Sequence, residues 1–118
     1  MNDEPLIAFC TCPDRDSAHA IAQALVEAGS AACVNILPGL CSVYLWQGKL
    51  ERSEEYLLMA KTTGKRYRAL EEQIQSLHPY ELPEIVAVPI TTGLPEYLAW
   101  VRDATTTHTT PNAAPATP

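Results

Sequence analysis

Residues 32–62 read ACVNILPGLCSVYLWQGKLERSEEYLLMAKT, and this stretch decides the fold. Residues 32–47 favour an extended strand, interrupted by Pro38 and Gly39, a pair typical of a bend or bulge. Gly48 opens a turn, and residues 54–62 then return as a second strand. The stretch therefore predicts a long antiparallel β-hairpin.

A strand and a helix precede the hairpin. Residues 6–10, LIAFC, form a short apolar run typical of a strand, and the segment CPD ends it. Asp14 or Asp16 can then cap a helix that stops at Gly29. The apolar residues of this helix recur at helical spacing, namely Ala18, Ile21, Ala22, Leu25 and Ala28.

A second helix, a strand and a last helix follow the hairpin. After Gly64, apolar residues step by three and four, as Tyr67, Leu70, Ile74 and Leu77. This helix should end at His78, because Pro79 disfavours the α conformation of the residue before it. Residues 84–90 form an apolar strand, and Pro95 suits the first turn of a final helix.

The order of elements is strand, helix, strand, strand, helix, strand, with one helix appended. That order predicts an α+β, ferredoxin-like split β-α-β domain over residues 1–104, with both main helices on one face of a four-stranded antiparallel sheet. Residues 105–118 contain no Asp, Glu, Lys or Arg, so we expect a disordered C-terminal tail.

The predicted strands are apolar on both faces. In the first strand Ala8 and Cys10 share one face while Ile7 and Phe9 share the other. A sheet with helices on one side normally presents polar residues on its other side. We therefore expect the second face to be covered by further copies of the chain.

Composition excludes several classes of function. A formal net charge of −6 over 118 residues argues against a nucleic-acid-binding protein. The sequence has neither a signal-peptide pattern nor an apolar run of about 20 residues that could cross a membrane. We expect a cytoplasmic protein whose four cysteines are reduced thiols. The motifs GxSxG, GxGxxG and the P-loop are absent, so the sequence predicts no enzyme. The adjacent pair Glu54 and Glu55 is interpreted as solvated surface.

Four blocks together resemble the CutA divalent-cation-tolerance family: residues 31–51, 54–63, 77–90 and 97–100. The resemblance covers residues 6–103 in order. It implies a ferredoxin-like fold, a homotrimer in the cytoplasm, and a role in tolerance to divalent metals, with copper bound by some members.

The resemblance also implies a copper site made by Cys10 and His78. Leu77 stands where some relatives have a second histidine. Cys12 could replace that ligand if the first strand continues through Thr11. Thiolate and imidazole together suit copper or zinc. The alternative is that Cys10 is a small buried hydrophobic residue and that His78 only stabilises a turn.

A second group of residues suits a small-ligand cleft between subunits: Tyr44, Trp46, Lys61, Tyr80 and Glu84. The resemblance supports this interpretation, because the CutA family is similar in trimeric architecture to the PII proteins, which bind small molecules at such clefts. The alternatives are interface packing for the two aromatic residues and an ion pair for Lys61 and Glu84. Two functions therefore stay open, a trimeric metal-binding protein and a trimeric sensor or scaffold for a small ligand or partner protein.

Overall fold

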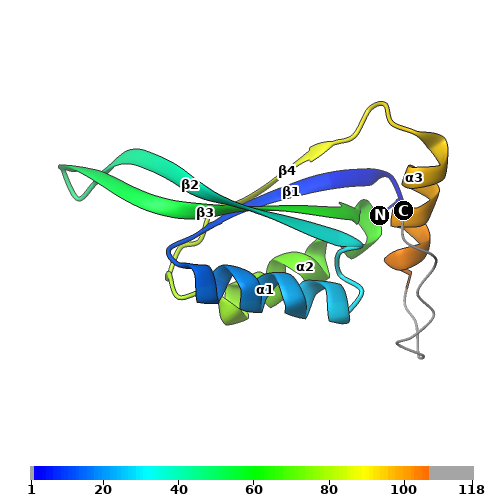
Figure 1. Ribbon diagram of the computed structural model, residues 1–118, viewed down its shortest axis with the longest axis horizontal. Helices are drawn as coiled ribbons and strands as arrows, with labels where there is room; N and C mark the ends of the chain where they lie inside the picture. The colour runs from blue at the N-terminus through cyan, green and yellow to red at the C-terminus, as the bar shows by residue number, and fades with distance from the viewer. Residues whose placement is uncertain (1, 107–118) are drawn as a thin grey trace.

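The computed structural model describes residues 2–106. Figure 1 shows a four-stranded sheet with two helices beneath it and a third helix at the end opposite the hairpin tip. Along the chain the elements are β1 (Pro5–Cys12), α1 (Arg15–Glu27), β2 (Cys33–Trp46), β3 (Lys49–Thr63), α2 (Gly64–Leu77), β4 (Ile85–Pro89) and α3 (Pro95–Ala104).

The sheet is antiparallel throughout, in the order β2-β3-β1-β4. Strand β1 thus lies between β3 and β4, and α1 and α2 cover the same face. This arrangement confirms the predicted α+β, ferredoxin-like fold with its appended helix.

The turn of the hairpin has the backbone conformation expected of a tight β-turn between two strands. Gln47 and Gly48 both have positive φ, 52° and 81°, as in the two-residue turns whose twist matches that of paired strands. The β2–β3 register shifts between Leu37 and Leu40, at the Pro38–Gly39 bulge. The hairpin prediction is confirmed, although β3 begins at Lys49, earlier than residue 54, because paired residues continue up to the turn.

The two main helices begin and end at signals in the sequence. Asp14 caps α1, accepting a hydrogen bond from the Ser17 backbone N–H to Oδ1 at 2.7 Å. Helix α2 ends at Leu77, and His78 already has extended backbone angles, as expected before Pro79.

The core lies between the sheet and these helices. Its apolar side chains come from alternate positions of the strands and from one face of each helix, and include Ala8, Leu25, Leu58, Leu70 and Ile74. The opposite face of the sheet is also apolar, and Val86 and Val88 are 51% and 45% exposed there. The prediction of two apolar faces is therefore correct.

The C-terminal end of α3 departs from the expected boundary. Thr105, assigned to the disordered tail, is buried, and its hydroxyl donates to the Val101 carbonyl at 2.8 Å. The hydroxyl provides a local partner for this helix end, which is why order extends past residue 104. The remainder of the predicted tail, 107–118, lies outside the described residues. Within the described part, no helix is both long and apolar enough to span a bilayer.

Candidate functional site

Two cysteines and a histidine meet at one end of the core. Strand β1 continues through Thr11, so the side chains of Cys10 and Cys12 point to the same side, toward the helices. His78 reaches them from the C-terminal end of α2. The possible ligand atoms of these three buried residues all lie within 4.8 Å of one another. The structure thus brings together the residues predicted to bind metal, while their roles as ligands stay predictions.

Both ring nitrogens of His78 have backbone partners. Nδ1 accepts a hydrogen bond from the Tyr80 backbone N–H at 3.1 Å, and Nε2 lies 2.7 Å from the Thr11 carbonyl oxygen. Since a carbonyl can only accept, Nε2 carries the proton and the ring is the neutral tautomer. His78 therefore joins the end of β1 to the loop after α2, and a metal would have to replace one of these bonds.

The two thiols differ in acidity because they share a hydrogen bond. Donation to Cys12, together with burial, raises the pKa of Cys10. Accepting that hydrogen bond lowers the pKa of Cys12, against the opposing effect of burial. The Cys10 sulfur also lies 3.7 Å from the Thr11 carbonyl oxygen, a second acceptor for its proton. Cys12 is therefore the first of the pair to ionise, and thiolate is the form that binds metal.

Leu77, the position at which the resemblance implies a second histidine in some relatives, is 47% exposed. Its side chain faces solvent and offers no ligand atom. Cys12 is fully buried beside Cys10 and His78, so it is the third possible ligand in this group.

A cavity of about 830 Å³ lies between the hairpin and the loop after α2, and Thr11 is part of its lining. Four of the five predicted cleft residues line it, namely Tyr44, Trp46, Tyr80 and Glu84. The cavity lies within the 300–1,000 Å³ range typical of small-ligand sites.

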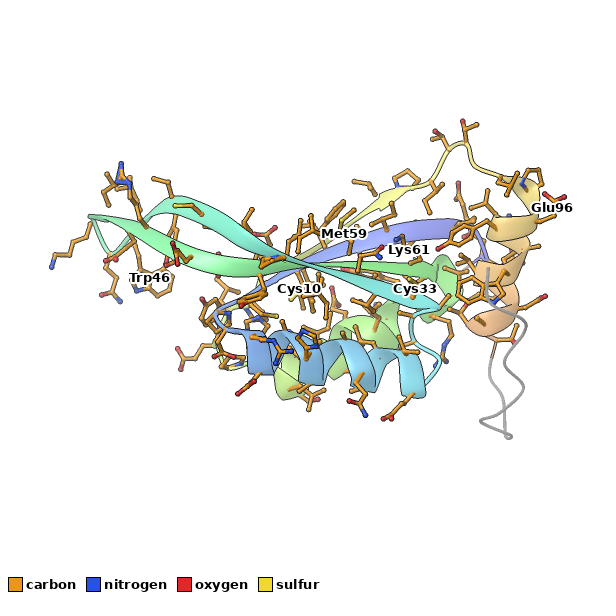
Figure 2. The ribbon with its side chains drawn as sticks, viewed as in Figure 1. Cys10, Cys33, Trp46, Met59, Lys61 and Glu96 are labelled. Atoms are coloured by element: carbon orange, nitrogen blue, oxygen red, sulfur yellow. The ribbon has the colours of Figure 1, made fainter. Side chains whose placement is uncertain are left out.

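Lys61 does not line this cavity, and its place in a cleft between subunits stays a prediction. It pairs in the sheet with Ile7 and Cys33, and its ammonium group donates to the Asn35 side chain. Six residues of extended strand separate it from Glu55 in the cavity wall, about 20 Å at the usual rise. Figure 2 shows Trp46 near the hairpin tip and Lys61 far along the sheet toward α3.

Glu55 was not among the predicted site residues. It is only 6% exposed, so its interpretation as solvated surface was wrong. Strand alternation puts Glu55 on the same face as Leu57 and Met59, a signal that could have separated it from Glu54. The Tyr80 hydroxyl donates to Glu55 Oε2 at 2.9 Å. Desolvation, reinforced by Glu55, raises the pKa of Tyr80 to about 12, so its hydroxyl stays a donor at neutral pH.

Three further acidic residues line the cavity, Glu51, Glu81 and Glu84, and none of its lining residues is Lys, Arg or His. The cavity lining therefore combines aromatic and acidic side chains, with no basic side chain to balance their charge.

Comparison with known proteins gives a consistent result. The family model described as CutA1 divalent ion tolerance protein matches residues 6–104. A divalent-cation tolerance protein CutA from Thermus thermophilus is 50% identical over 99 residues, covering 84% of this chain and 96% of the relative. A CutA homologue from Xenopus laevis is 49% identical over 96 residues, 81% of this chain, which spans only 64% of that longer protein.

Solved structures agree in fold. The crystal structure of CutA from Xylella fastidiosa superposes with a TM-score of 0.86 at 44% identity, covering 87% of this chain and 99% of the other.

Proposed function

The chain belongs to the CutA1 divalent ion tolerance family, and from this premise we propose that it is a metal-binding protein whose site is formed by Cys10, Cys12 and His78. The observation that carries the proposal is the convergence of three buried donor atoms to within 4.8 Å. The protein acts in tolerance to metal ions by binding rather than by catalysis.

The donor set fits a soft or borderline metal ion. Thiolate and imidazole prefer copper and zinc, whereas calcium and magnesium prefer oxygen ligands. Copper is the ion we propose first, with zinc as the closest competitor. Binding requires ionised thiols, so uptake should release protons.

The proposed assembly is a homotrimer. The exposed apolar side chains of β4 and the long hairpin support it, because such a face is stable in water only when a partner covers it. A reducing cytoplasm suits the four cysteines, all of which are unpaired thiols.

Metal titration against a competing chelator tests the proposal. We expect about one copper or zinc ion per chain, since the three donors form one site. Cys10→Ser and His78→Ala should each weaken binding, whereas Cys33→Ser should leave it unchanged, because Cys33 lies outside the cluster. Equal uptake by wild type and the Cys10→Ser, His78→Ala double variant would contradict the proposal.

A second candidate function is that of a PII-like trimeric sensor or scaffold. The cavity beside Thr11 favours it, because aromatic and charged side chains from the hairpin and from the loop after α2 line a space of ligand size. Small-ligand binding that survives loss of the metal site would support this second function.

A further inference from the structure

We propose that the cavity binds an organic cation, a molecule that carries an ammonium or guanidinium group. This inference rests on the second candidate function and names its ligand class. The cavity walls contribute four carboxylates and no basic side chain. An anionic ligand would be repelled by these carboxylates. A cation would supply the positive charge that the cavity lining lacks.

Glu55 provides the strongest evidence that the cavity suits a cation. Its side chain is 94% buried, since only 6% is exposed, and it faces the cavity. Its hydrogen bond within the described residues comes from the Tyr80 hydroxyl, which is a neutral donor and uses one carboxylate oxygen. A buried carboxylate is costly without an opposite charge, and the second oxygen is available to a ligand.

The spacing of the carboxylates favours an organic cation over a metal ion. A bare divalent ion needs several oxygens within its first coordination shell. Within the part of the chain that the structure describes, Cys10, Cys12 and His78 form a group whose possible ligand atoms lie within 4.8 Å of one another. The cavity glutamates form no such group among the described residues. Carboxylates spread around about 830 Å³ instead suit a ligand that is larger than an ion.

The aromatic walls fit the same ligand class. Tyr44 and Trp46 from β2 and Tyr80 from the loop after α2 border the cavity together. The face of an aromatic ring attracts ammonium and guanidinium groups, and carboxylates nearby add charge-assisted hydrogen bonds. Trp46 lies in the cavity lining, so its fluorescence can report a bound ligand.

Putrescine, a diamine, is a suitable probe, with uncharged 1,4-butanediol as the matched control ligand. We expect saturable binding of putrescine by calorimetry at low salt, together with a change in tryptophan fluorescence that persists in Trp100→Phe and disappears in Trp46→Phe. Butanediol should not bind. Glu55→Gln and Glu84→Gln should each weaken binding by about tenfold or more, the usual effect of losing a charge-assisted hydrogen bond.

Glu54→Gln is the matched control variant, because Glu54 is exposed and lies outside the cavity lining. It should bind putrescine as wild type does. Equal binding by the Glu54, Glu55 and Glu84 variants would overturn the inference, as would tighter binding of Ca²⁺ than of putrescine. A Lys or Arg side chain of another copy of the chain could supply the same cationic group. A wild-type protein that takes up no putrescine at any concentration would assign the cavity to such a side chain and overturn the small-ligand proposal.

The two proposals fail separately. Cys10→Ser should weaken metal binding and leave putrescine binding unchanged, whereas Glu55→Gln should weaken putrescine binding and leave metal binding unchanged. Loss of both ligands in both variants would show that one disrupted fold, and not two sites, explains the results, and it would overturn the assignment of the cavity.

Discussion

Replacing His78 by alanine should destabilise the protein even when every metal ion has been removed. The imidazole is 8% exposed and holds two backbone groups, the Thr11 carbonyl at 2.7 Å and the Tyr80 N–H at 3.1 Å. Its ring also lies against the Tyr80 ring, with centroids 4.9 Å apart. Alanine removes all three contacts.

The size of the effect follows from the two backbone groups. Leaving a buried donor or acceptor without a partner costs about 1–3 kcal/mol. Water can reach part of the space that the ring vacates, so we expect a total loss of about 2–4 kcal/mol in the free energy of unfolding, less than two full penalties.

Urea unfolding in the presence of a strong chelator measures this loss. Both proteins must be compared at the same protomer concentration, because assembly contributes to the apparent stability. His19→Ala is the matched control, since His19 is exposed on α1, and it should change stability by less than about 0.5 kcal/mol. A His78→Ala protein as stable as wild type under chelation would refute this structural role and leave metal ligation as the reason for the histidine.

Two further predictions concern the assembly and the core. Light scattering should give about three times the monomer mass for wild type across dilution. Val86→Asp places a charge on the exposed apolar face and should give a smaller mass. A wild-type monomer would contradict the proposed trimer. Leu25→Ala should lower the free energy of unfolding in urea by about 2–5 kcal/mol, because Leu25 is fully buried. Val26→Ala, at a 45% exposed position, should lower it by less than about 1 kcal/mol. Similar losses in the two variants would show that α1 does not pack as described.

The fold was predictable from the sequence because local signals agreed with one another. The Pro38–Gly39 bulge, the turn at Gly48 and the helix end before Pro79 each act within a few residues. Thr105 was misjudged because the composition of the following residues suggested a tail, whereas its buried hydroxyl donates to the Val101 carbonyl within α3.

The candidate sites were predictable only in part. The alternation of β1 placed Cys10 and Cys12 on one side, and the topology then brought them to the end of α2. Lys61 was assigned to a cleft between subunits by its chemistry, and within one chain it lies along β3 away from the cavity. Glu55 was overlooked because its hydrogen-bond partner, Tyr80, lies 25 residues away in the sequence.

The group formed by Cys10, Cys12 and His78 is connected to the cavity by one set of hydrogen bonds. His78 Nδ1 accepts from the Tyr80 backbone, and the hydroxyl of the same Tyr80 donates to Glu55 in the cavity wall. Thr11 connects them a second time, since its carbonyl faces His78 Nε2 and the residue lines the cavity. A metal ion that takes either ring nitrogen must break a bond to Thr11 or to Tyr80, so it acts on a residue that shapes the cation site. Any resulting change in cation affinity must, by linkage, be matched by an equal change in metal affinity.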